Sequence, residues 1–476
     1  MFRQPKFLFG DWTAARHTSG VTMVRIVPVL LFLAALANDN AQNQLARDIY
    51  RELIEINTTD SNGDTTKAAT AMAVRLKAAG LPDSDVRVIG PNPRKGNLIA
   101  RYRGTGQRKP LLLLAHLDVV EARPEDWSVD PFKFIEKDGF FWGRGTTDDK
   151  AMAAVWVATL IRYRQEHYIP DRDLIVALTA DEEGGDHNGV QWLLANHREL
   201  IDAGYALNEG GESYVKNGRY VLNAVQPSEK MYQSFRLEVR NSGGHSSRPV
   251  KDNAIYTLSE GLTRLSKYQF PVKLNEVTTE YYKRMATLYT GQTAADMKGV
   301  TKSPPDGAAA ARLSKSPYDN ALLRTTCVAT RLDAGHAENA LPQTARAIVN
   351  CRILPGDSPG EVQATLTRVL GDPKISVSPL GDATPSKPSP LNPEIIFALE
   401  RITTHMWPGV PVVPVMSTGA TDGLYLRNSG IPTYGVSGFF EDIEDTRAHG
   451  RDERLGVKQF YEGREFLYQL VKALSS

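Results

Sequence analysis

The chain has 476 residues, more than one ordinary domain, so its length predicts two or three domains with a substantial buried core. Lys and Arg number 56 and Asp and Glu 55, which leaves a formal net charge of +1. No basic run with interleaved aromatic residues is present. The composition therefore argues against nucleic acid, and against an acidic membrane surface, as a partner.

Near the N-terminus, an apolar stretch from Ile26 to Ala37 follows a single arginine and ends in small residues. Its length suits the apolar part of a signal peptide and is short for a membrane span, and residues 35–37 fit an A-x-A cleavage site. We expect residues 1–37 to be a signal peptide region, with Met23 as an alternative start. The mature protein would be periplasmic or secreted, without stable membrane association; a short buried helix is the other interpretation.

From about residue 43, apolar strands alternate with helices along the chain. Four runs predict strands, at residues 96–104, 109–118, 173–181 and 205–211. Helical patterns at 151–167 and 188–200 lie between the later strands. This alternation predicts an α/β domain with a doubly wound, mostly parallel sheet. In such sheets, ligands gather at the carboxyl ends of the strands.

A change in the pattern of apolar and polar residues near residue 226 predicts a second domain. Alternating strands and helices there suggest an α+β domain over residues 226–384 that is inserted into the first domain. The first domain would then consist of residues 43–225 and 391–476, with a Pro-rich linker at 382–393. We interpret the polar segment from Lys273 to Asp319 as a loop-like insertion that enlarges the inserted domain.

The two cysteines, Cys327 and Cys351, lie in adjacent strand-like segments. In an oxidising compartment they could form a disulfide, which would agree with export. Two buried free thiols are the alternative. No CxxC or Cys/His spacing predicts a structural zinc site.

Acidic and imidazole side chains follow several of the apolar runs: His116 and Asp118 in HLD, Asp148 in GRGTTDDK, Glu182 and Glu183 in DEEGG, and Glu209 in NEGG. Each motif alone has a simpler interpretation, such as a surface histidine, a helix N-cap or a solvated acidic loop. Together they present the oxygen and nitrogen ligands that Zn²⁺ takes in proteins. The group therefore predicts metal-assisted hydrolysis.

The alternation of side chains along a strand suggests different roles for these residues. His116 and Asp118 point to the same side of a strand end, so Asp118 can hydrogen-bond the second ring nitrogen of His116. Glu182 and Glu183 point apart, so one can bind metal while the other acts as a general base.

With a distal AHG containing His449 and with SGGHSSRP, six motifs resemble those of the co-catalytic zinc peptidases and acylases. That family includes aminoacylase, carnosinase, bacterial glutamate carboxypeptidase and succinyl-diaminopimelate desuccinylase. The resemblance extends from about residue 44 to residue 473, and we expect an exported bacterial member. It implies two Zn²⁺ ions per chain, with Co²⁺ or Mn²⁺ as substitutes.

The resemblance also implies a role for each residue of the group. Asp148 would bridge both metals, with His116 and Glu209 on one ion and Glu183 and His449 on the other. Glu182 would be the general base, and Asp118 would orient His116.

By the same resemblance, residues 43–225 and 391–476 would be the catalytic domain, and the inserted domain at 226–384 would be the family's lid, of the dimerisation type. Residues outside the metal-ligand group match the family's substrate-binding motifs. His245 would stabilise the oxyanion, and Asn339 and Arg352 would hold the substrate carboxylate. Backbone N–H groups of the STGATDG loop, at Thr418 and Gly419, would assist. A turn histidine and a surface arginine are the simpler interpretations of His245 and Arg352.

Taken together, these features predict a zinc-dependent hydrolase that cleaves an amide or peptide bond next to a free carboxylate, of the dipeptidase or carboxypeptidase type. Its substrate would be a small peptide. An N-acyl amino acid acylase acting on N-acyl amino acids is the alternative within this class, and a metal-dead binding protein is the alternative outside it. A homodimer through the lid is a further expectation.

Overall fold

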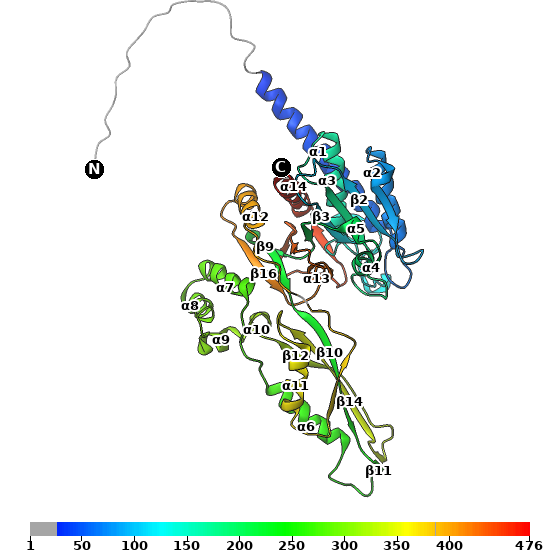
Figure 1. Ribbon diagram of the computed structural model, residues 1–476, viewed down its shortest axis with the longest axis vertical. Coiled ribbons are helices and arrows are strands. Elements are labelled where there is room, and N and C mark those ends of the chain that lie inside the picture. The colour runs from blue at the N-terminus through cyan, green and yellow to red at the C-terminus, as the bar shows by residue number, and fades with distance from the viewer. Residues whose placement is uncertain (1–25, 386) are drawn as a thin grey trace, which may run out of the picture. The chain divides into compact units, whose positions relative to one another are not determined.

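The computed structural model describes residues 26–385 and 387–476, with side chains described from Asp39 onward (Figure 1). The chain divides into two compact units, residues 1–45 and 46–476. Helix α1 (Ile26–Glu55) begins in the first and ends in the second. Residues 1–25 of the expected signal peptide, including Met23, lie outside the described residues. No helix within the described range is long and apolar enough to cross a membrane.

The larger unit contains a ten-stranded sheet with strand order β1-β2-β6-β3-β7-β17-β9-β8-β18, and β16 pairs with β9. Its strands are β1 (Val86–Ile89), β2 (Asn97–Tyr102), β3 (Leu111–His116), β6 (Leu174–Thr179), β7 (Tyr205–Asn208), β8 (Ser213–Lys216), β9 (Arg219–Glu229), β16 (Val412–Ser417), β17 (Thr433–Gly435) and β18 (Phe440–Asp442). The central strands β6, β3, β7 and β17 run parallel. The predicted α/β fold with a largely parallel sheet is confirmed.

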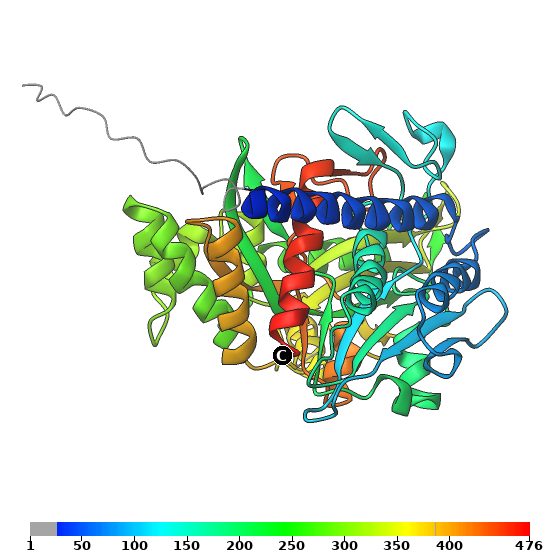
Figure 2. The same ribbon diagram turned by 90° about the horizontal axis from the view of Figure 1, so that it is seen from above.

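Helices accompany this sheet because its central strands are apolar on both faces. Every residue of β3 and β6 is buried, as expected for strands covered on both sides. The helices of this part are α2 (Thr65–Ala78), α3 (Lys150–Gln165), α4 (Gly189–Asn196), α5 (Arg198–Ile201), α12 (Pro393–Met406), α13 (Gly423–Asn428) and α14 (Val457–Ala473), with short 3₁₀ turns at Asp83–Asp85 and Pro124–Asp126 (Figure 2). A small sheet, β19-β5-β4, joins β4 (Ile135–Lys137), β5 (Phe140–Trp142) and β19 (Arg454–Gly456).

A second, four-stranded sheet forms the predicted α+β part, with strand order β12-β14-β10-β15. It comprises β10 (Met231–Arg240), β12 (Thr326–Ala334), β14 (Thr344–Ile353) and β15 (Ser376–Leu380). Helices α6 (Ala254–Lys267) and α11 (Pro359–Leu370) bury its apolar face, where alternate residues such as Phe235, Leu237 and Val349 join one core. A separate two-stranded ribbon pairs β11 (Gly244–His245) with β13 (Ala340–Leu341).

The expectation of a loop-like insertion that enlarges the lid is wrong. The segment folds into α7 (Glu276–Leu288), α8 (Gly291–Val300), α9 (Gly307–Leu313) and α10 (Pro317–Leu323). Val277, Tyr281 and Met285 recur at helical spacing and form one core with Leu222 of β9 and Val413 of β16. These few apolar residues stand among many polar ones, so composition alone suggested a loop on the lid. The segment is instead a small helical layer on the first sheet.

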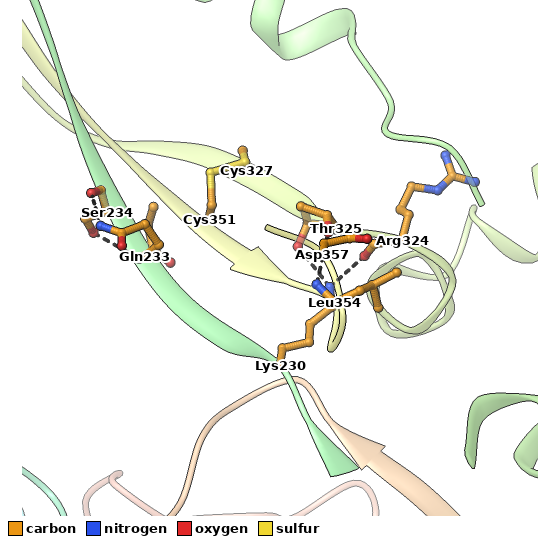
Figure 3. Close-up of a disulfide and its surroundings, with 11 residues drawn as sticks. Lys230, Gln233, Ser234, Arg324, Thr325, Cys327, Cys351, Leu354 and Asp357 are labelled. Carbon is orange, nitrogen blue, oxygen red and sulfur yellow. Dashed lines mark hydrogen bonds between the residues drawn. A yellow bond between two sulfur atoms is a disulfide. The ribbon is translucent and has the colours of Figure 1, made fainter. Parts of the chain in front are cut away.

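The two cysteines form a disulfide in the second sheet (Figure 3). Cys327 on β12 lies directly opposite Cys351 on β14 in the antiparallel register, and their sulfur atoms are 2.04 Å apart. The bond attaches the edge strand β12 to its neighbour β14. Of the two interpretations left open by the sequence, the disulfide is the one that the structure contains.

Candidate active site

Three neighbouring parallel strands bring most of the predicted ligands together. His116 is the last residue of β3, Glu182 and Glu183 follow β6, and Glu209 follows β7. Because β6, β3 and β7 are adjacent in the sheet, their carboxyl ends meet at one edge. Asp148 reaches the same edge from the loop that precedes α3.

The carboxylate of Asp148 lies between two histidines. Its Oδ1 atom is 2.8 Å from Nε2 of His116, and its Oδ2 atom is 3.0 Å from Nε2 of His449. Each histidine also faces a second carboxylate. Glu209 Oε2 is 3.7 Å from His116 Nε2, and Glu183 Oε2 is 2.9 Å from His449 Nε2. All five predicted ligands therefore lie in one cluster, with Asp148 at its centre.

These contacts shift the pKa values of the side chains in the cluster. Hydrogen bonds with Asp148 and Glu183 raise the pKa of His449 to about 10. Burial would lower the pKa of His116, but the charge of Glu209 and the hydrogen bond with Asp148 outweigh it and raise that pKa well above its usual value. Burial opposes ionisation of Asp148, yet the two histidines hold its pKa well below the usual range. The carboxylates of the cluster therefore favour positively charged partners.

The donor set fits a pair of divalent cations. Among the described residues, the ion pairs of Asp148, Glu183 and Glu209 involve only histidine, never Lys or Arg. Ligand atoms of His116, Asp148 and Glu183 all lie within 4.8 Å of one another, as do those of His116, Asp149 and Glu209. Imidazole and carboxylate in this proportion are typical zinc ligands.

Asp149 was not among the predicted ligands. It is 3% exposed, and its Oδ2 atom has no hydrogen-bond partner within the described chain. The doubled acid in GRGTTDDK was the available signal, and it could not indicate which member faces the site.

Glu182 differs from its neighbour Glu183 in having a free side chain. No hydrogen bond or ion pair of the described residues involves its carboxylate, although its backbone N–H donates to Asp118. Burial raises its pKa well above the usual value, and the negative charge of Glu209 raises it further. A carboxyl group with a raised pKa beside a ligand cluster is suited to accept a proton from water.

The structure changes how Asp118 acts. Nδ1 of His116 is 2.9 Å from the backbone carbonyl oxygen of Asp118 and 3.7 Å from its carboxylate. The carboxylate instead accepts the backbone N–H groups of Glu182, at 3.1 Å, and Glu183, at 2.9 Å. The predicted hydrogen bond between Asp118 and the second ring nitrogen of His116 is therefore present, but the backbone carbonyl makes it, while the carboxylate stays within ion-pair distance. The chain turns directly after β3, which points the carbonyl at the imidazole and leaves the carboxylate to fix the DEEGG loop.

The comparison with known proteins decides the family. Residues 112–473 match Peptidase family M20/M25/M40. The chain belongs to this family.

One relative of this M20 chain is the human (Homo sapiens) N-fatty-acyl-amino acid synthase/hydrolase PM20D1, which is 29% identical over 374 residues, covering 76% of this chain and 74% of that protein. A solved structure of an M20 family metallo-carboxypeptidase from Sulfolobus solfataricus superposes with a TM-score of 0.66 at 17% identity, covering 90% and 98% of the two chains. A dinuclear metal-binding M20 peptidase from Bacillus subtilis gives a TM-score of 0.59 at 12% identity, covering 92% and 99%. The two superpositions show the fold. Family membership shows that the chain is a peptidase-type hydrolase, as predicted.

Two further residues of this M20 member hold the metal-ligand loops in place. Glu453 is fully buried and accepts the backbone N–H groups of Gly145, Thr147 and Asp148, at 3.0, 2.7 and 3.2 Å. Arg144 Nη1 donates to Glu453 at 2.7 Å. Its Nη2 donates to the carbonyl of Gly450, beside His449, at 2.9 Å.

This pair therefore joins the loop of Asp148 to the loop of His449. Neither Arg144 nor Glu453 was predicted from the sequence, because no motif marks a glutamate four positions after the distal histidine as the partner of a distant loop.

The lid residues lie apart from the metal-ligand cluster. His245 is exposed, and its Nδ1 atom accepts the backbone N–H of Ser247 at 3.1 Å. The carbonyl of Asn339 accepts the N–H of Ser246 at 3.0 Å. Arg352 on β14 stacks over the ring of Tyr232, with 5.0 Å from its guanidinium carbon to the ring centroid. Among the described residues, no hydrogen bond or ion pair links these side chains to the cluster.

The STGATDG loop follows β16 and borders the cluster. The N–H of Gly419 donates to Oγ of Ser417 at 3.0 Å, so this donor is already used within the loop. Ser417, Ala420 and Thr421 of the loop line the cavity beside the cluster, and Thr418 and Gly419 lie between Ser417 and Ala420 in the sequence. The loop thus reaches the cavity through residues other than the two that were predicted.

Proposed function

We propose that this M20 family member hydrolyses an amide or peptide bond next to a free carboxylate, as a dipeptidase or carboxypeptidase does. One observation carries the proposal. The two oxygens of Asp148 face His116 and His449, and the unpaired carboxylate of Glu182 lies in the same cluster. This arrangement suits hydrolysis assisted by two metal ions and a general base.

Two Zn²⁺ ions are the proposed cofactors, with Co²⁺ or Mn²⁺ as substitutes. The first would be held by His116, Asp148 and Glu209, and the second by Asp148, Glu183 and His449. When bound, such ions act as Lewis acids and lower the pKa of water. The choice of zinc rests on the mixture of imidazole and carboxylate donors.

Glu182 would take a proton from the attacking water and pass it to the leaving amine. Asp118 supports this step by accepting the backbone N–H groups of Glu182 and Glu183, which fixes the direction of both side chains. The carbonyl of Asp118 holds the ring of His116 with Nε2 toward Asp148.

The lid would supply the groups that recognise substrate. His245 would donate to the oxyanion that forms on the carbonyl, while Asn339 and Arg352 would hold the free carboxylate, with backbone donors near Thr418 and Gly419 assisting. Among the described residues, no hydrogen bond or ion pair joins the lid side chains to the cluster. The proposed roles would therefore need the lid to move when substrate binds, or His245 to come from the partner subunit of the dimer.

An N-acyl amino acid acylase is the second candidate, favoured by the likeness to the human N-fatty-acyl-amino acid synthase/hydrolase. A metal-dead binding protein is the rival of another class. The complete ligand set and the free Glu182 argue against that rival, because binding alone needs no general base.

We further propose that the protein is exported and forms a homodimer through its lid. The apolar stretch from Ile26 to Ala37 and the disulfide support export. The edge strand β12 supports pairing, because it exposes Val328 and Leu332, which are 61% and 65% accessible. A native N-terminus near Asn38 and a dimer in sedimentation are the expected results; an intact Met1 or Met23 would contradict export.

The hydrolase proposal is tested by metal analysis together with a substrate panel. We expect two metal ions per chain and turnover of dipeptides or of N-acyl amino acids that end in a free carboxylate. Amidated versions of the same compounds should react poorly. A metal-loaded protein without turnover on any of them would contradict the proposal.

A further inference from the structure

A second cavity, with a volume of about 520 Å³, lies where α6, α10 and the start of β12 meet. It shares no residue with the metal-ligand cluster, and none of the predicted substrate-binding residues lines it. Figure 3 draws three of its wall residues, Arg324, Thr325 and Cys327. A ligand in this cavity would therefore be separate from the substrate of the proposed hydrolysis.

Arg324 is the only charged residue among the described residues that line this cavity. It is the C-cap residue of α10 and is 5% exposed. A guanidinium has five N–H donors. Within the described chain, Nη1 donates to Oε1 of Gln269 at 2.7 Å and Nη2 donates to Oγ of Ser314 at 3.0 Å, while Nε has no acceptor. Both acceptors are uncharged, so the guanidinium keeps unused donors as well as its charge.

No carboxylate balances the charge of Arg324. Among the described residues it forms no ion pair, and burial lowers the pKa of its guanidinium without a nearby carboxylate to oppose the shift. The carboxylate of Asp357 accepts the hydroxyl of the adjacent Thr325 at 2.8 Å, but it pairs with Lys273. A buried cation without an anion costs free energy. An anion that enters the cavity would reduce this cost.

The other walls of the cavity are apolar or uncharged. The apolar residues that line it are Leu262, Leu265, Phe270 and Val328. Asn320 lines it four positions before Arg324, and its buried Oδ1 atom has no donor within the described chain, so it can accept from a ligand or from a bridging water. A single positive group in a largely apolar chamber favours a ligand with one negative group on an apolar body.

The size of the cavity sets the size of that ligand. A volume of about 520 Å³ equals that of about 17 water molecules at about 30 Å³ each, so a molecule of about ten to fifteen heavy atoms fits. A small inorganic anion would leave most of the apolar wall uncovered.

We propose that this cavity binds an amphipathic monocarboxylate. Its carboxylate would accept from the N–H groups of Arg324 that Gln269 and Ser314 leave unused, and its apolar chain would lie against Leu262 and Phe270. The edge strand β12, along which the proposed dimer would pair, forms one side of the cavity. A second copy of the chain is therefore the alternative occupant that the experiment must distinguish.

The test titrates the metal-loaded protein with decanoate in a calorimeter and compares decanol and acetate. Decanol keeps the apolar chain without the charge, and acetate keeps the charge without the chain. We expect decanoate to bind at least about tenfold more tightly than either, because decanol loses a charge-assisted hydrogen bond and acetate loses the buried apolar surface.

Two variants and a matched control assign the binding to this cavity. R324M should weaken decanoate binding by about tenfold or more while kcat, KM and metal content stay unchanged. Its unfolding temperature should not fall, because an apolar side chain replaces an unpaired buried charge. N320D, which places a carboxylate in the same wall, should also weaken binding about tenfold. R312M is the control, since Arg312 on α9 pairs with Asp296 and does not line the cavity.

Three outcomes would overturn the inference. The first is equal decanoate affinity in the wild type, R324M and N320D, or equal affinity of the wild type for decanoate and decanol. The second is binding that R352K removes and R324M leaves intact, which would place the acid in the proposed substrate site. The third is a dimer that decanoate dissociates in sedimentation, which would show that a second copy fills the cavity.

Discussion

The cluster at the strand ends and the ribbon that carries His245 are built in opposite ways. His116 has 1% of its side chain exposed and contacts two carboxylates, whereas the imidazole of His245 is exposed and, among the described residues, hydrogen-bonds only Ser247 of its own turn. The groups for metal binding and proton transfer are thus fixed by the core of the first sheet before any substrate arrives. The lid groups expected to recognise substrate stand on other elements, and among the described residues their side chains have no hydrogen bond or ion pair to the cluster.

The largest expected effect lies within the cluster. E182Q should reduce kcat by about 10²–10⁴-fold, because the proton acceptor is lost while the ligands remain. Kinetics combined with metal analysis should show both ions still bound. H116A is the matched comparison and should lose metal as well as activity. A near-normal rate for E182Q would show that another group is the base.

The next effect tests the lid side of the comparison. H245A should lower kcat by about 10²–10³-fold, because an oxyanion donor acts only in the transition state. Metal content and unfolding temperature should match the wild type, since the exposed imidazole supports neither. Loss of metal in this variant would mean that the ribbon belongs to the cluster after all.

A third prediction concerns the support of the cluster. E453Q should weaken metal affinity by about 10–100-fold, because the loop of Asp148 loses the charged acceptor that fixes it. Competition with a chelator measures this. The free energy of unfolding should also fall, by up to about 3–5 kcal/mol, because Arg144 is left as a buried unpaired charge. The double variant R144M/E453M removes that charge and should regain stability without regaining metal affinity.

The fourth prediction separates binding from chemistry on the lid. R352K should raise KM about tenfold for substrates with a free carboxylate and change kcat little, because lysine cannot form the bidentate contact. R346K is a suitable control, since Arg346 lies on the same strand and pairs with Glu238. Equal KM values for carboxylate and amidated substrates in the wild type would remove this role.

The smallest effect on activity is expected from the disulfide. Replacing Cys327 and Cys351 with serine should lower the free energy of unfolding by about 2–4 kcal/mol, because the unfolded chain without the disulfide has more conformational freedom. Metal affinity should be unchanged, because the bond lies in the second sheet. Denaturant unfolding and metal titration together check this. A drop in metal affinity would show that the two regions are coupled.

The sequence predicted the parts of the site that lie at strand ends. The runs before His116, Glu182 and Glu209 are largely apolar, which identifies buried parallel strands and therefore a common edge. The role of Glu453 could not be predicted, because its partners are backbone N–H groups of a distant loop, 305 positions away at Asp148, and backbone donors leave no mark in a sequence.

The helical layer formed by α7 to α10 was not predicted, for another reason. Its apolar residues cover only one narrow face of each short helix, so the average composition of the segment is that of a loop. The direction of the Asp118 carboxylate depended on a single turn after β3, and periodicity along a strand gives no information about the chain beyond the strand's end.

The Arg144–Glu453 pair has a consequence for how the protein is made. The two residues are 309 positions apart, so the loop that carries Asp148 leaves the ribosome long before the side chain that fixes it. Contacts of such separation form late, after most of the chain has been synthesised. A growing chain that has not yet reached His449 lacks one predicted ligand and the residue that holds the Asp148 loop, and could not act as a hydrolase. The order of synthesis itself delays activity until His449 and Glu453 have been made.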